Sequence, residues 1–325
     1  MGPSDRVAGG RGWSLMRRAV LGAVALLGAC GAGEVAHAQC GAASYYARQR
    51  SAAVAESLLT NPGRLARRAA DPDLVIMAVE RQATGYDSVR IPGARLLLLR
   101  DFVVDRDSLI TELPPVERLV EVLAARGVTD RSRIVLYGDL LAAARLWFTL
   151  DYLGLGERTA LLDGGLAAWR AEGLPLERGR PGPVAPGGFT PTVRPDVLIG
   201  AAEIRNRSGD ESLRIVDARA PEEYRGDVAE VGVSRNGHIP GATNLDWTTL
   251  LEDGWFRRPS SLRAQLLAAG VGEGKELIAV CRVGTRASVL YFAGRYLGVP
   301  TRLYDGSMND WSRRGLPIAT GPGPR

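Results

Sequence analysis

The chain has 325 residues, of which 46% are apolar and 24% charged, and its formal net charge is +5. This length allows two domains, and the composition is that of a globular protein rather than a disordered or fibrous one. The positive charge comes almost entirely from arginine, with Lys275 as the single lysine, and acidic residues are interleaved with it. Because the sequence contains no concentrated basic segment, we expect no nucleic-acid partner.

The N-terminal residues predict a targeting segment. Arg17-Arg18 precedes an apolar run that ends at Ala29 and is too short to span a bilayer. Small residues at the end of 1–38 predict a signal peptide over that range, followed by a leader over 39–60. A lipobox-like sequence ending at Ala29 predicts instead a lipid on Cys30. In either case we expect an exported protein, periplasmic or anchored to face the periplasm, whose only membrane contact would be that lipid.

Two halves of the chain share a pattern. Five short motifs recur in the same order, 142 to 148 residues apart; the pairs begin at Ile91 and Ile239, Gly127 and Gly270, Tyr152 and Tyr296, Asp163 and Asp305, and Gly173 and Gly315. A repeat of this length predicts tandem duplicated domains rather than a solenoid. We place these domains at 61–178 and 197–320, joined by a linker over 179–196 that is rich in proline and glycine.

The second half alternates strand and helix patterns. Short apolar runs predict strands at 213–216, 276–280 and 300–304, and helical patterns occur at 260–269 and 286–297. Such alternation is typical of a parallel sheet covered on both faces. The sequence therefore predicts an α/β fold with two tandem domains, each a mainly parallel sheet with helices on both faces.

Cys281 lies between a predicted strand and a predicted helix, in a short loop that contains Gly284. Ligands of parallel sheets gather at the carboxyl ends of the strands. The N–H groups and dipole of the following helix attract an anion there and favour a thiolate. Cys281 could instead be an inert buried cysteine, but Arg282 and Arg286 on either side of the glycine favour a reactive one.

At this point the sequence resembles the rhodanese family, in its tandem thiosulfate sulfurtransferase form, over roughly residues 70–318. The resemblance is carried by Val216-Asp217-Ala218-Arg219, Glu222-Glu223-Tyr224, Gly237-His238-Ile239-Pro240-Gly241-Ala242, the 281–286 loop, and Asp305-Gly306-Ser307 with Trp311. The first half departs from the pattern. Tyr137 falls opposite Cys281 and Arg90 falls opposite His238, so we expect the first domain to be catalytically silent.

The resemblance implies a sulfurtransferase in which Cys281 takes the outer sulfur of thiosulfate as a persulfide, and cyanide or a thiol accepts it. Substrate and persulfide would be bound by Arg219 and by Arg282, Val283, Gly284, Thr285 and Arg286. Arginine suits the oxyanions of thiosulfate, and backbone N–H groups would stabilise the persulfide. Asp217 would orient Arg219 without touching the substrate, or would satisfy the N–H groups of a turn.

Three alternatives stay open. The four residues between Cys281 and Arg286 make a loop one residue shorter than in the related phosphatases, which disfavours phosphate. A 3-mercaptopyruvate sulfurtransferase is a nearer alternative, although its family loop carries less charge, and a non-catalytic sulfur carrier is a third. We expect His238 to serve a structural turn, because that is its place in the family. The sequence has no cluster of cysteine and histidine at metal-ligand spacing and no glycine-rich nucleotide motif, so we expect no cofactor.

Overall fold

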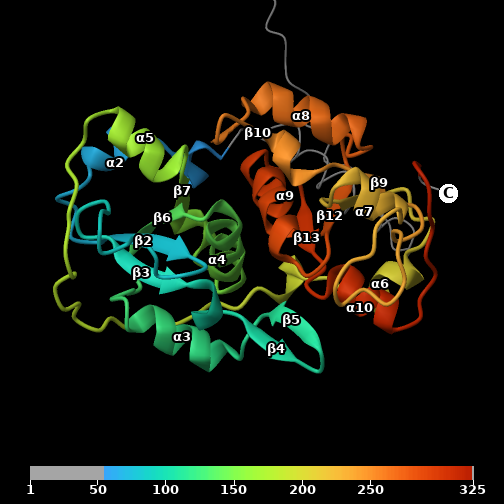
Figure 1. Ribbon diagram of the computed structural model, residues 1–325, viewed down its shortest axis with the longest axis horizontal. Coiled ribbons are helices and arrows are strands. Elements are labelled where there is room, and N and C mark those ends of the chain that lie inside the picture. Colours follow the sequence, from blue (N-terminus) through green and yellow to red (C-terminus); the bar gives the residue numbers. More distant parts are fainter. Residues whose placement is uncertain (1–54, 324–325) are drawn as a thin grey trace, which may run out of the picture. The chain divides into compact units, whose positions relative to one another are not determined.

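The computed structural model describes residues 55–323 (Figure 1). The predicted signal peptide, the lipid site at Cys30 and most of the 39–60 leader lie outside these residues. Within them, no helix is both long enough and apolar enough to cross a membrane.

The first half contains a five-stranded parallel sheet in the order β1-β7-β6-β2-β3. Its strands are β1 (Leu59–Thr60), β2 (Leu74–Glu80), β3 (Arg95–Leu98), β6 (Arg133–Gly138) and β7 (Thr159–Leu162). The helices of this half are α2 (Pro62–Ala66), α3 (Val116–Ala124), α4 (Leu140–Tyr152) and α5 (Gly165–Ala171). An antiparallel hairpin, β4 (Val104–Arg106) and β5 (Leu109–Glu112), follows β3.

Both faces of the first sheet are covered, because successive side chains of a strand point to opposite faces. On β2, Val75, Met77 and Val79 belong to one apolar cluster, which includes residues of α3 and α4. Ile76 and Ala78 belong to another, which includes residues of α2 and α5. The almost continuous apolar sequence of β2 is the consequence of this double burial.

The second half contains a four-stranded parallel sheet in the order β13-β12-β8-β9. Its strands are β8 (Leu213–Asp217), β9 (Thr243–Asn244), β12 (Glu276–Val280) and β13 (Thr301–Leu303). Its helices are α6 (Ala201–Asn206), α7 (Pro221–Arg225), α8 (Pro259–Ala268), α9 (Thr285–Tyr296) and α10 (Ser307–Arg313), and β10 (Leu251–Glu252) pairs with β11 (Trp255–Phe256). Five short 3-10 helices complete the described residues: η1 (Glu56–Leu58), η2 (Leu99–Asp101), η3 (Gly156–Arg158), η4 (Pro195–Val197) and η5 (Trp247–Leu250).

The two halves share one apolar cluster, in which α4 packs against α9 (Figure 1). Trp147 of α4 meets Phe292 of α9 edge to face, with ring centroids 5.0 Å apart, and Phe148 meets Tyr291 in the same way at 5.1 Å. Aromatic pairs at these separations stabilise by more than their buried area alone. The helix that follows Cys281 is therefore held firmly from the first half.

The α/β fold class and the paired parallel sheets predicted from the sequence are confirmed. The same contacts occur in both halves: Trp169 Nε1–H donates to the Pro175 carbonyl at 2.8 Å, and Trp311 Nε1–H to the Pro317 carbonyl at 2.7 Å. The domain boundaries and the duplication stay predictions. The first sheet also includes β1, which precedes the boundary that we placed at residue 61.

Candidate active site

Cys281 lies directly after β12, the strand that pairs with both β8 and β13, and it is the only cysteine of residues 55–323. Its backbone is held on the side of α10. The Cys281 N–H donates to Ser307 Oγ at 3.1 Å, and its carbonyl accepts from the Met308 N–H at 3.1 Å. The residue thus has a fixed position at the carboxyl edge of the sheet, where the sequence placed it.

Gly284 shapes the loop between β12 and α9, which we call the catalytic loop (residues 281–286). Its φ is +79°, and an added Cβ would lie 2.8 Å from Asp305 Oδ1 and 3.0 Å from Arg145 Nη1. Only glycine combines this backbone conformation with so little space. The turn lets α9 begin at Thr285, and the first N–H groups of this helix have no partners inside it, as at the start of any helix.

The Cys281 side chain is fully buried, although the sequence argument favoured a reactive cysteine over an inert buried one. Residues 227–236, between the two sequence motifs of the second half, contact the elements around it. Arg282 Nη1 donates to the Val231 carbonyl at 2.9 Å, and the Ser234 N–H donates to Ser312 Oγ at 3.1 Å. Thiol and solvent are thus separated in this conformation, so a donor reaches Cys281 only after side chains or this segment move.

Arg219 is enclosed by acceptors rather than open to solvent. It is 1% exposed, and its Nη2 donates to Asp217 Oδ2 and to the Gly237 carbonyl, both at 2.7 Å. Its Nη1 donates to Glu230 Oε2 at 2.5 Å. Asp217 is also buried, and its Oδ1 accepts from the Arg219 backbone N–H at 3.0 Å, so it makes both contacts that the sequence left open for it. This geometry gives Arg219 a positioning role unless a ligand displaces a carboxylate.

Two glutamates pair with the arginine at the end of the catalytic loop. Arg286 Nη1 donates to Glu223 Oε2 at 2.5 Å, and its Nη2 donates to Glu230 Oε1 at 2.9 Å. Arg282 lies farther away, with its Nε 4.0 Å from Glu230 Oε1. Three arginines therefore face three carboxylates, those of Asp217, Glu223 and Glu230. From the sequence, Glu223 was known only as part of a family motif, and no role was predicted for Glu230.

The pKa values of Glu223 and Glu230 shift in opposite directions. Burial raises the pKa of Glu230, and its hydrogen bond with Glu223 raises that pKa further. Burial would also raise the pKa of Glu223, but hydrogen bonds from Glu230 and Arg286 lower it to about 2. Burial opposes the charge of Arg286, yet the hydrogen bond to Glu223 and the charge of Cys281 raise the pKa of Arg286. The guanidinium of Arg286 therefore stays charged.

The first half supplies contacts to the catalytic loop that sequence reasoning missed. Thr111 of β5 donates its hydroxyl to the carbonyl of buried Val283 at 2.7 Å. The φ of Thr111 is +60°, an uncommon and strained conformation for a β-branched residue. Arg145 of α4, fully buried, pairs with Asp305 Oδ1 at 2.5 Å and donates to the Thr111 carbonyl at 2.6 Å. Contacts between residues so distant in sequence left no local signal.

His238 is fully buried and lies in the 237–242 motif, next to the C-terminal segment that contains Ala319. Its ring stacks on Tyr224 with centroids 3.8 Å apart, and its Nδ1 lies 2.8 Å from the Tyr224 carbonyl. Its backbone pairs with Ala319. These contacts agree with a structural role, and burial lowers the pKa of His238, which favours a neutral ring.

The matching position of the first half has no comparable loop. Tyr137, which we set opposite Cys281, lies inside β6, and only Asp139 separates that strand from α4. The cavity at this edge has a volume of about 470 Å³. It is lined by Glu80, Asp139 and Asp163 and by no arginine, lysine, histidine or cysteine of the described residues. The lining thus offers an anionic donor no positive group and no nucleophilic sulfur, which agrees with a silent first domain.

A parallel α/β sheet that ends in a lone cysteine, followed by a tight glycine turn and a helix, defines a site for covalent group transfer through sulfur. Comparison with known proteins identifies the family. Residues 200–314 match the model of the rhodanese-like domain. Together with the relatives given next, this match shows that the chain belongs to the rhodanese family and is a sulfurtransferase.

This chain matches three curated relatives over nearly the whole length of each relative. The probable 3-mercaptopyruvate sulfurtransferase of Pseudomonas aeruginosa is 37% identical over 79% of this chain and 96% of its own. The sulfur carrier protein TtuD of Thermus thermophilus is 32% identical, covering 77% of this chain and 92% of its own. The thiosulfate sulfurtransferase of Azotobacter vinelandii is also 32% identical, covering 78% and 93%.

A solved structure gives the same family. The rhodanese-fold 3-mercaptopyruvate sulfurtransferase SseA of Escherichia coli superposes with a TM-score of 0.68 at 29% identity. The match covers 77% of this chain and 98% of that one. The resemblance stated from the sequence is therefore confirmed, whereas these relatives carry three different names for the sulfur donor or role.

Proposed function

We propose that this protein transfers sulfane sulfur from thiosulfate to cyanide or a thiol through a persulfide on Cys281. The Cys281 thiolate attacks the outer sulfur of thiosulfate, and the sulfur–sulfur bond breaks with its electron pair leaving on sulfite. The acceptor then attacks the terminal sulfur of the persulfide, which releases the product and restores the thiolate. Two displacements balance without an external oxidant or reductant.

The observation that carries this proposal is the position of Cys281 between the strand end, the start of α9 and Arg286. The helix start offers N–H groups to a terminal sulfur anion, and Arg286 adds a charge that Glu223 and Glu230 hold in place. Arg282, which is 29% exposed, is the least enclosed of the three arginines and would contact the sulfonate of thiosulfate.

A second donor, 3-mercaptopyruvate, is favoured by the charge balance of the site. Because Asp217, Glu223 and Glu230 offset the three arginines, the cluster suits a monoanion at least as well as a dianion. Cys281 would take the sulfur of that donor as its carbon–sulfur bond breaks, and pyruvate would leave after protonation. The identity of 37% to a probable 3-mercaptopyruvate sulfurtransferase supports this alternative.

The test is to give the purified chain each donor with cyanide and to measure sulfite and pyruvate release. Intact-mass spectrometry after exposure to the donor alone reports the persulfide. We expect sulfite release with thiosulfate and a mass gain of one sulfur atom, both abolished by Cys281→Ser and kept by the matched variant Cys40→Ser. Pyruvate release alone would assign the second donor. A persulfide that forms without turnover would mean a carrier, and no adduct from either donor would refute the proposal.

We also propose that the protein is exported, on the basis of the N-terminal apolar run and its flanking arginines. Mass spectrometry of the protein isolated from its native host tests this. Cleavage after Ala38 would leave Gln39 as the first residue, and lipidation would leave a modified Cys30 at the N-terminus. A chain that retains the apolar run would contradict export by either route.

A further inference from the structure

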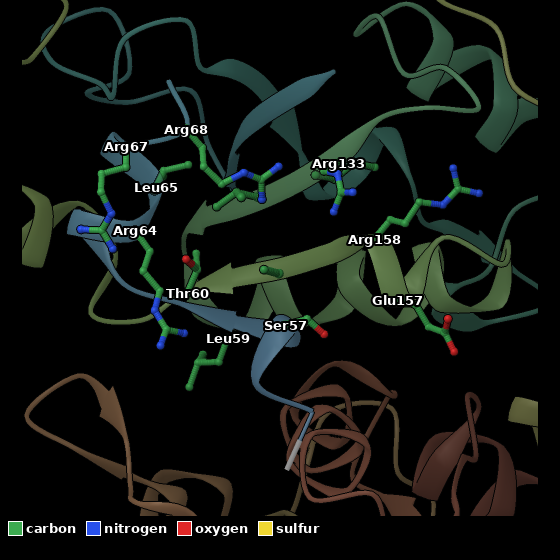
Figure 2. Close-up of a pocket in the computed structure, with 13 residues that line it drawn as sticks. Ser57, Leu59, Thr60, Arg64, Leu65, Arg67, Arg68, Arg133, Glu157 and Arg158 are labelled. Carbon is green, nitrogen blue, oxygen red and sulfur yellow. The ribbon is translucent and has the colours of Figure 1, made fainter. Parts of the chain in front are cut away.

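A second concentration of arginine lies in the first half, at a pocket formed by α2, β1, β6 and the segment before β7 (Figure 2). The pocket has a volume of about 330 Å³. Its charged and hydroxyl-bearing lining residues are Arg64, Arg67, Arg68, Arg133, Arg158, Glu157, Ser57 and Thr60. None of its lining residues belongs to the catalytic loop, so the pocket needs an explanation of its own.

The arginines come from separate parts of the sequence. Arg64, Arg67 and Arg68 belong to α2 and the turn after it, and Figure 2 shows them on one side of the pocket. Arg133 begins β6 and Arg158 ends η3, and these two lie on the other side. The sequence shows only the short basic segment 64–68, and the fold adds Arg133 and Arg158 to it, so the full cluster could not be predicted from the sequence.

Carboxylates do not balance these charges as they do around Cys281. Arg68 pairs with Asp71 at 2.7 Å, and Arg158 donates to the Asp130 carbonyl, which is uncharged. Within residues 55–323, the guanidinium groups of Arg64, Arg67 and Arg133 form no ion pair. Glu157 is the one acidic residue of the described lining. The pocket therefore carries an excess of positive charge that an anion from solution would reduce.

The shape and chemistry of the pocket restrict the ligand. Guanidinium groups on opposite sides call for a ligand with more than one anionic group, because a single small anion contacts one side only. Ser57 and Thr60 add hydroxyl groups that bond to oxyanions, while Leu65, Ile134 and Val135 supply an apolar wall. Phosphate oxygens match the planar fork of arginine in two-point contacts.

We propose that this pocket binds a phosphate chain of two or more phosphoryl groups, either inorganic or part of a nucleotide. Arg133 and Arg158 would contact one end of the chain, and Arg64 and Arg68 the other. The site is independent of sulfur transfer. Because all five arginines are exposed to solvent, salt would screen the attraction, and binding would weaken as ionic strength rises.

The experiment is calorimetric titration of the full chain with inorganic triphosphate, with ATP and with orthophosphate as the single-group control. We expect triphosphate to bind and orthophosphate to bind at least about tenfold more weakly. The double variant Arg64→Gln/Arg133→Gln should lose at least about tenfold in affinity for triphosphate, since it removes one charge-assisted contact on each side. Its sulfur-transfer rate should not change, which also shows that it is folded.

The double variant Arg118→Gln/Arg205→Gln is the matched control, because it also removes two charges and both residues are exposed arginines outside the pocket, on α3 and α6. Equal binding of triphosphate and ATP would assign recognition to the phosphate chain alone, and tighter binding of ATP would add a contact of the nucleoside with the apolar wall. Equal loss of affinity in the control and in Arg64→Gln/Arg133→Gln would reduce the effect to overall charge and overturn the proposal. Absence of triphosphate binding at low salt would do the same.

Discussion

Replacing Gly284 by alanine tests the shape of the catalytic loop. An alanine at this φ of +79° costs about 1–2 kcal/mol in backbone energy. Its Cβ would also lie 2.8 Å from Asp305 Oδ1 and 2.9 Å from the Asp305 carbonyl oxygen, closer than real Cβ contacts occur. The carbonyl belongs to the backbone and cannot swing away, and the carboxylate is paired with Arg145 Nη1 at 2.5 Å. Overpacking of this kind adds about 1–3 kcal/mol.

The expected loss of unfolding free energy for Gly284→Ala is therefore about 2–5 kcal/mol, a large part of the stability of an ordinary domain. Urea unfolding followed by tryptophan fluorescence measures it, and sulfite release by the folded fraction should fall as well because the loop is displaced. Gly254→Ala is the matched control. Gly254 has a φ of +83° with nothing within 4 Å of the added Cβ, so it isolates the backbone cost. If both variants lost the same stability, the packing argument around Gly284 would be wrong.

Three further predictions concern residues beyond the loop. Thr111→Val should leave the buried Val283 carbonyl without its partner and lower kcat/KM about tenfold, whereas Thr111→Ser should stay near wild type; equal rates for Val and Ser variants would exclude a role for the hydroxyl. Burial, and next the charge of Asp305, raise the pKa of Glu112 to about 7, against the opposing charges of Arg145 and Arg106. Protonated Glu112 therefore contributes stability below about pH 4.5 that is lost as the pH rises through about 7. The melting temperature of Glu112→Gln should therefore exceed that of the wild type at pH 8 and equal it at pH 4. A difference in melting temperature that does not change with pH would contradict this. His238→Ala should lower the unfolding free energy by about 2–4 kcal/mol through the lost Tyr224 contacts while the folded enzyme keeps its kcat, and inactive but fully stable protein would point to catalysis instead.

The regular elements of the second half could be predicted because their signals are local. The strand expected at 276–280 is β12 as observed, and the helix expected at 286–297 begins one residue earlier, at Thr285. Apolar runs bounded by glycine set these limits, and burial on both faces of a parallel sheet reinforces them. The position of Cys281 at the strand end followed from the same local pattern.

The surroundings of Cys281 could not be predicted, because they depend on contacts between distant segments. Glu230 reaches Arg219 and Arg286 only when the 227–236 segment folds back over the loop, and Thr111 meets Val283 across 172 positions of the sequence. From the sequence we expected the arginines near Cys281 to bind oxyanions. Buried guanidinium groups need acidic partners, and only the tertiary fold determines which carboxylates these are.

The hydroxyl of Thr111 ties a half without a nucleophile to the loop that has one. The first half therefore contributes to the shape of the catalytic loop. We expect a change that loosens the β4–β5 hairpin to slow turnover at Cys281, although the hairpin takes no part in the chemical step. Turnover at Cys281 is therefore expected to depend on both halves of the chain, which gives a physical reason for one polypeptide to carry them together.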